Sequence, residues 1–187
     1  MKLNKIKALC KAAHRAILYN ELGNGGELRR QWIGTGSGIY LLDGLPILGT
    51  ANIPPLMGLE GNAVDKIKIT QETLPTVIST EDYSADEPAL NALPCIVSVG
   101  GTDLALFRSA YQVWALDAAE LAPALNQNGT IKMRWMPDGK PYFVVFRGMF
   151  LEAILFRERS GLLDDASRKG LGIWLNWLKP AEERDEK

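Results

Sequence analysis

The chain has 187 residues, of which 47% are hydrophobic and 23% are charged, a balance that excludes a disordered protein and allows a full hydrophobic core. The formal net charge of −1 excludes a uniformly basic nucleic-acid-binding protein. No apolar run is long enough to form a membrane-spanning helix, and the lysine-rich start lacks the continuous apolar segment of a secretory signal. We therefore expect a cytoplasmic protein without membrane contact.

Metal-binding and catalytic patterns are missing from the sequence. Cys10, Cys95 and His14 cannot be assembled into a zinc site of the usual spacing. The cysteines are expected to be small buried hydrophobic residues, and His14 is expected to cap a helix or lie at the surface. No acid–base pair or nucleophile with a partner is recognisable. The sequence predicts no enzyme, no cofactor and no metal.

The first elements in the chain are predicted to be a helix followed by an antiparallel meander. Ile6, Leu9, Cys10 and Ala13 recur at helical spacing, which predicts a helix over residues 4–13 with Asn4 as its N-cap. Three strands are predicted to follow. They cover residues 15–21, 28–33 and 38–42, and glycine-rich turns join them.

Lys7, Lys11 and Arg15 are the candidate nucleic-acid-binding residues. They are spaced by four, so a helix would place them in one basic stripe beside its apolar face. The first twenty residues contain no acidic side chain. The alternative interpretation is an ordinary solvated helix face without a partner.

Residues 45–94 are predicted to be a Pro-rich insertion, because six of the ten prolines of the chain lie between Asp43 and Pro94. Proline cannot join a central ladder of hydrogen bonds, so we expect an irregular flap. Only residues 64–70 and 74–79 have the composition of short strands.

The second ordered part repeats the order of the first. Strands are predicted at residues 95–99 and over 104–116, followed by a helix at residues 118–125 with Asp117 as its N-cap. Three further strands are predicted at residues 130–135, 141–147 and 149–156. We expect one domain, 1–187, with halves at 1–44 and 95–160.

The end of the chain is predicted to form a C-terminal helix over residues 161–178, with a charged tail over 179–187. Trp174 and Trp177 lie at helical spacing in this segment. They are either core residues of the chain or anchors for a partner, because tryptophan is common at interface hot spots.

The element order resembles that of a DNA sliding clamp, the ring-shaped polymerase processivity factor. A helix opening at Asp117 leads through a glycine turn to the segment from Ile131 to Trp135, and a strand beginning at Lys140 follows. The resemblance implies an α+β fold in which an antiparallel sheet is built from two helix-plus-three-strand halves. It also implies helices that present lysine and arginine to DNA, which Lys7, Lys11 and Arg15 would suit.

Three features depart from the clamp pattern. The second predicted helix carries Asp117 and Glu120 and no basic residue, the Pro-rich insertion has no counterpart, and a full ring needs six such domains. We expect a non-catalytic binding module linked to DNA metabolism, with DNA or a DNA-processing protein as partner, and a homo-oligomer. The alternative is a protein-binding accessory or assembly protein without nucleic-acid contact, binding through the insertion or through Trp174 and Trp177.

Overall fold

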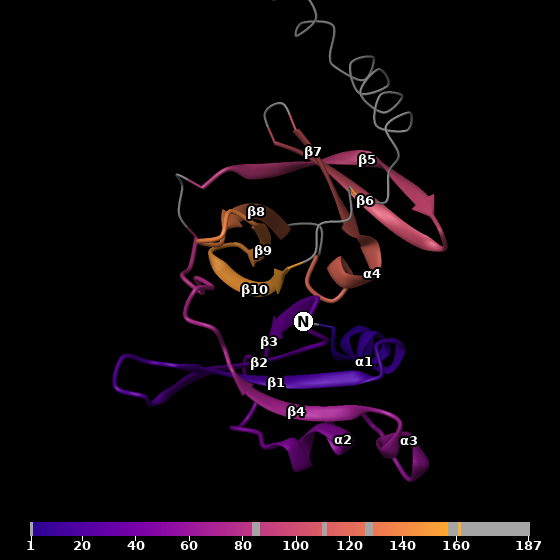
Figure 1. The fold of residues 1–187 in the computed structure, drawn as a ribbon, viewed down its shortest axis with the longest axis vertical. Helices are drawn as coiled ribbons and strands as arrows, with labels where there is room; N and C mark the ends of the chain where they lie inside the picture. Colours follow the sequence, from indigo (N-terminus) through magenta and orange to yellow (C-terminus); the bar gives the residue numbers. More distant parts are fainter. Residues whose placement is uncertain (1, 84–86, 110–111, 126–128, 157–160, 162–187) are drawn as a thin grey trace, which may run out of the picture.

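A ten-stranded sheet forms the body of the molecule, and its strand order is β4-β1-β2-β3-β10-β9-β8-β5-β6-β7 (Figure 1). The computed structural model describes residues 2–83, 87–109, 112–125, 129–156 and 161. All neighbouring strands with an assigned register are antiparallel except β1 and β4, which run parallel. The predicted α+β class is confirmed.

The elements have the following bounds in chain order: α1 (Leu3–Ala12), β1 (Arg15–Leu22), β2 (Leu28–Gly34), β3 (Gly38–Leu41), η1 (Thr50–Asn52), α2 (Ile53–Leu56), α3 (Asn62–Asp65), β4 (Lys68–Thr73), β5 (Ala89–Val99), β6 (Thr102–Ser109), β7 (Gln112–Asp117), α4 (Ala118–Leu121), β8 (Gly129–Trp135), β9 (Pro141–Arg147) and β10 (Phe150–Leu155).

The first helix is where the apolar spacing places it, but its capping differs from the expectation. Ile6 and Cys10 are fully buried, as the helical period requires. Lys2, rather than Asn4, occupies the N-cap position, and no side chain caps the helix there. The chain leaves the helix at His14, whose φ of 50° lies in the left-handed region that helix ends use.

The two halves meet where β3 and β10 pair antiparallel, with Tyr40 opposite Ala153. Outward from this pair the order is β2 and β1 on one side and β9 and β8 on the other. An antiparallel pair has a local two-fold axis normal to the sheet, and such an axis leaves each face of the sheet on the same side. The helices that precede β1 and β8 therefore fall on one common face.

Contacts between the halves agree with this arrangement. The Lys2 amide donates to the carbonyl of Pro123 at 3.1 Å, and the Tyr40 hydroxyl donates to the carbonyl of Glu120 at 2.7 Å. Asp117 caps α4 as predicted, accepting from the Ala119 amide at 2.9 Å. The helix is shorter than predicted and ends at Leu121, before Pro123.

Each face of the sheet has its own apolar cluster. The helix-side cluster contains residues from both halves, including Leu18, Ile33, Phe143 and Leu155. Alternate positions on the same strands point to the opposite face, where Tyr19, Trp32, Val144 and Ile154 are among the buried residues. A third small cluster holds Leu104, Leu106 and Ala115 of β6 and β7.

The Pro-rich insertion predicted over residues 45–94 is not confirmed as one irregular flap, because the segment contains α2, α3, β4 and the first part of β5. Pro54 and Pro55 lie in the first turn of α2, where a missing amide proton costs little. The predicted strand at 64–70 is shifted to β4, which extends the sheet beyond β1. Pro94 lies within β5, and the pairing of β5 with β6 changes register between Ala92 and Ile96. A bulge of this kind accommodates proline in a strand.

Residues 74–83 are not a strand. They form a strap across the sheet face opposite the helices, where Leu74 is buried. Arg134 of β8 donates to the carbonyls of Ser79 at 2.9 Å and Glu81 at 3.0 Å, and it pairs with Glu87 at 2.8 Å. The Tyr142 hydroxyl accepts from the Ser79 amide at 3.1 Å. These bonds make the strap a part of the fold.

The glycine-rich segment between β2 and β3 is a hairpin connection, as predicted. A Cβ atom on Gly34 would collide with the carbonyl oxygen of Gly38, and Gly36 has a φ of +95°. The predicted C-terminal helix, Trp174, Trp177 and the charged tail lie outside the described residues.

Candidate nucleic-acid interface

The solvent-facing side of α1 carries cations and no carboxylate. Lys2, Lys5 and Lys11 are exposed, and no acidic residue occurs in the helix. The amphipathic pattern explains this placement, because burial of Ile6 and Cys10 against the sheet turns the polar positions outward.

Lys7 is only partly available. Its side chain is half-buried, and its Nζ atom donates to the carbonyl of Gly58, next to α2, at 3.2 Å. Ammonium groups have three donor positions, so Lys7 can still contact an anion while it keeps this bond.

Arg15 does not belong to a helical stripe. The helix ends at Ala12, and Arg15 is the first residue of β1. Its guanidinium pairs with Glu72 of β4 at 3.3 Å, and both side chains are a little over 40% exposed. The predicted continuous row Lys7–Lys11–Arg15 is wrong, because the left-handed turn at His14 redirects the chain into the sheet.

The structure instead brings two other lysines beside the end of α1. The carbonyl of His14 accepts from the Lys68 amide at 3.0 Å, and the imidazole Nδ1 atom of His14 lies 3.3 Å from the carbonyl oxygen of Lys66. Arg15 and Lys68 are paired residues in the β1–β4 ladder. Lys66 and Lys68 are both exposed. We call the exposed lysines Lys2, Lys5, Lys11, Lys66 and Lys68 the basic surface.

Sequence reasoning missed Lys66 and Lys68 because their position depends on the parallel pairing of β4 with β1. A signal was present in the predicted strand at 64–70, but nothing in that segment identified its neighbour in the sheet. The acidic residue Asp65 is also exposed next to this edge, and it lowers the positive charge there.

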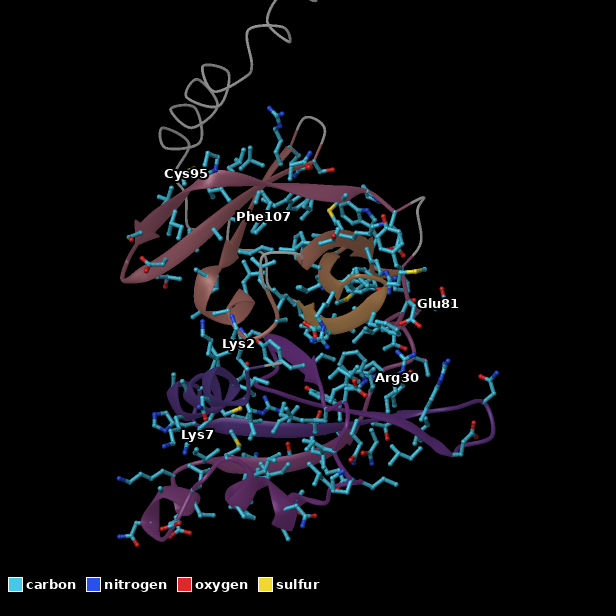
Figure 2. The ribbon with its side chains drawn as sticks, turned by 180° about the vertical axis from the view of Figure 1, so that it is seen from behind. Lys2, Lys7, Arg30, Glu81, Cys95 and Phe107 are labelled. Carbon is cyan, nitrogen blue, oxygen red and sulfur yellow. The ribbon has the colours of Figure 1, made fainter. Side chains whose placement is uncertain are left out.

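Arg29 and Arg30 are not neighbours of the basic surface. Figure 2 shows Arg30 on the opposite side of the view from Lys2 and Lys7. Arg29 lies 3.9 Å from Glu21, and Arg30 lies 3.8 Å from Asp82. The second helix adds no cation either, since α4 contains only alanine, leucine and the buried Glu120.

The two cysteines, metal binding and membrane-spanning helices can also be judged from the described part of the chain. Burial raises the pKa of the Cys10 thiol to about 12, which keeps it neutral and unreactive. Within the described ranges, no group of three His, Cys, Asp or Glu side chains could hold a metal ion, and no helix is long and apolar enough to cross a membrane. Cys95 is half-buried beside the third cluster.

Comparison with models of protein families, with curated proteins and with solved structures gives no match to this chain.

Proposed function

We propose that this chain is a non-catalytic module that binds the phosphate backbone of duplex DNA, with a clamp-like organisation of its two halves. The observation that carries the proposal is the basic surface, whose Lys2, Lys5 and Lys11 belong to α1 or its N-cap, on the face of the sheet that α1 and α4 share. Lys66 and Lys68 lie at the edge of the sheet beside the end of α1. Lysines attract phosphate without reading base sequence, so binding through them is sequence-independent.

The antiparallel junction of β3 and β10 supports the clamp-like part of the proposal. It relates two units of one helix and three strands, which is the element order of a sliding-clamp domain. The short, acidic α4 and the β4 strand next to β1 are specific to this chain. We propose that the first half alone contacts DNA, and that useful binding requires several copies held together.

A titration of fluorescently labelled duplex DNA at low salt tests this proposal. Lys5→Glu/Lys11→Glu reverses two cations of the basic surface. The matched control Arg29→Glu/Lys140→Glu makes the same change of charge at two exposed positions elsewhere. We expect the first variant to lose at least tenfold in affinity and the control to bind within about twofold of wild type.

Salt provides the second measurement. Each phosphate contact that is lost should reduce the slope of log K against log salt by about 0.9. If both double variants lost the same affinity for DNA, the loss would follow from net charge alone. That result would contradict a localised binding surface. Failure of the wild-type protein to bind at low salt would remove the DNA proposal.

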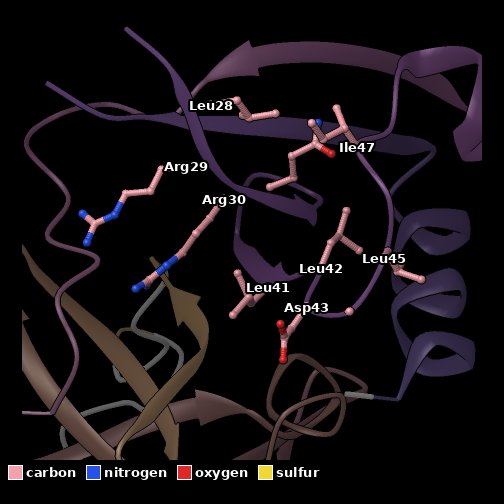
Figure 3. Close-up of a pocket in the computed structure, with 10 residues that line it drawn as sticks. Leu28, Arg29, Arg30, Leu41, Leu42, Asp43, Leu45 and Ile47 are labelled. Carbon is pink, nitrogen blue, oxygen red and sulfur yellow. The ribbon is translucent and has the colours of Figure 1, made fainter. Parts of the chain in front are cut away.

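A protein-binding role is the second candidate function, and a groove between the two halves favours it. The groove is lined by Arg30, Leu41, Asp43 and Ile47 (Figure 3), together with Phe150. It shares no residue with the basic surface, so the two roles can be tested separately.

A further inference from the structure

Strands β5, β6 and β7 have a second apolar face, which points away from the helix-side cluster. Successive residues of a strand point to opposite faces of the sheet. Phe107 of β6 belongs to the helix-side cluster, whereas Cys95 of β5 packs against the third cluster on the other face (Figure 2). We call the apolar residues of this other face the outer apolar face. They are Leu93, Cys95, Val97, Val99, Leu104, Leu106, Val113 and Ala115.

The middle of the outer apolar face is closed to solvent. Leu104 and Ala115 are 0% exposed, and Leu106 is 1% exposed. Within the described ranges, the apolar neighbours of these residues all belong to β5, β6 and β7. Helix α4 contacts β6 and β7 from the opposite side, since its buried Leu121 belongs to the helix-side cluster.

Another segment of the same chain must therefore cover this face. Side chains on one face of a sheet stand beside one another, and they are shielded from water only when a further element packs on top of them. The burial of Leu104 and Leu106 is that of a single chain, so the cover does not come from a partner.

The end of the chain is the stretch with enough apolar residues for this role. Apart from Met1, the other stretches outside the described ranges are residues 84–86, 110–111, 126–128 and 157–160. Together they contain two alanines and one tyrosine as their apolar residues. Residues 162–178 contain five leucines, one isoleucine and two tryptophans.

The spacing within residues 162–178 predicts a helix with one apolar stripe. Small and apolar residues recur at intervals of three and four, with one adjacent pair in each later turn. These stripe residues are Leu163, Ala166, Gly170, Leu171, Trp174, Trp177 and Leu178. The opposite side of such a helix holds Asp165, Lys169 and Asn176. A stripe of this kind needs an apolar surface to pack against.

The dimensions of this predicted helix fit the outer apolar face. Seventeen helical residues are about 25 Å long, and the eight residues of β6 span about 26 Å. Residues 157–161 join β10 to the segment and extend over about 17 Å at most. Four steps of about 4.8 Å separate β10 from β6 in the sheet, so the segment can begin beside these strands.

We infer that residues 162–178 form an amphipathic helix that docks on the outer apolar face of their own chain. The stripe with Trp174 and Trp177 faces Leu104 and Leu106 and shields Cys95. The two tryptophans are then core residues of the chain, and they are not anchors for a partner. This inference does not depend on DNA binding.

Disulfide trapping in the full-length protein tests the docking directly, because Cys95 is a free thiol on the outer apolar face. Ala166→Cys and Leu171→Cys each place a second thiol on the stripe, and Asn176→Cys places one on the opposite side as a control. After mild oxidation with copper phenanthroline, we expect a stripe variant to form an intramolecular disulfide with Cys95. Peptide mass spectrometry should show at least tenfold less of it in Asn176→Cys.

A second measurement follows the accessibility of Cys95 in variants that keep both native cysteines. Trp174→Asp places a carboxylate against the apolar face, whereas Asn176→Asp places one on the solvent side. We expect Cys95 to react with a thiol reagent at least tenfold faster in Trp174→Asp and within about twofold of wild type in Asn176→Asp. Cys10 is 0% exposed, so its slow reaction verifies that the sheet stays folded.

Three results would overturn the inference. They are no disulfide between Cys95 and a stripe position, equal trapping in the stripe and control variants, and equal reaction rates of Cys95 in Trp174→Asp and Asn176→Asp. Disulfides that join two chains would assign the face to the segment of a second copy, and would also contradict docking within one chain. Lys5→Glu/Lys11→Glu should leave the trapping unchanged, which separates this test from the DNA proposal.

Discussion

The two halves of the molecule have the same order of elements, but their helices have become different. α1 has ten residues and no acid, and it carries the exposed Lys5 and Lys11 and the half-buried Lys7, with Lys2 at its N-cap. α4 has four residues, is capped by Asp117 and buries Glu120. Similar strands therefore support one helix suited to an anionic partner and one helix suited only to packing. A repeated architecture does not imply a repeated surface.

Unlike the helices, the strands of the two halves have a common role, since both sets contribute side chains to one apolar cluster. Leu18 of β1 and Phe143 of β9 are fully buried in it. Side chains that share a close-packed interior are coupled in stability even when they are far apart in sequence. The halves should therefore unfold together, and this expectation can be broken by mutation.

The largest expected effect is that of Phe143→Ala, which empties the position of a fully buried aromatic ring in the second half. We expect a loss of about 3–5 kcal/mol in the free energy of unfolding, measured by urea denaturation. Leu18→Ala is the counterpart in the first half and should cost about 2–5 kcal/mol. Circular dichroism and tryptophan fluorescence should give one coincident transition for each variant. If amide hydrogens in β8–β10 exchanged quickly while those in β1–β3 stayed protected, the two halves would be shown to unfold separately.

The next effect compares how each half holds the strap. Arg134 of the second half has a side chain only 6% exposed, and it pairs with Glu87 at 2.8 Å. Because Arg134→Ala leaves a poorly solvated carboxylate, we expect a loss of about 3 kcal/mol. Arg30 of the first half is more exposed and lies 3.8 Å from Asp82, so Arg30→Ala should cost at most about 1 kcal/mol. Equal losses in thermal or urea denaturation would contradict this difference between the halves.

The smallest expected effect comes from adding a cation to α4, which tests the difference in charge between α4 and α1. Ala119 is exposed on α4, so Ala119→Lys gives the second half a cation with less than about 0.5 kcal/mol change in stability. If the shared face approaches DNA, affinity should rise a fewfold, and the salt slope should steepen by about 0.9 for one added contact. The control Ala92→Lys, at an exposed position on β5, should give no steeper slope. An unchanged slope for Ala119→Lys would place α4 away from the DNA.

Much of the local structure could be predicted from the sequence. The apolar period of Ile6, Leu9 and Cys10 identified α1, and alternation and turn residues identified β1–β3 and β8–β10. Asp117 is recognisable as a helix cap because aspartate is favoured at the N-cap position and Glu120 follows three residues later, as in a capping box. Signals of this kind lie within a few residues of the structure they specify.

The candidate sites depended on contacts that sequence spacing does not contain. Lys7 and Lys11 were correctly placed on α1, but the change from helix to strand at His14 took Arg15 out of the row and toward Glu72. Trp174 and Trp177 lie outside the described residues, so their role stays a prediction.

The amino-acid sequence by itself determined the α+β class, the positions of most strands and the acid-free first helix, because side-chain periods and turn residues act locally. Tertiary structure alone decided that β4 would pair parallel with β1, and so brought Lys66 and Lys68 to the end of α1. It also decided that β3 and β10 would pair, which joined the two halves in one sheet. Pairing between distant strands depends on the packing of the whole apolar interior, and no local spacing records it.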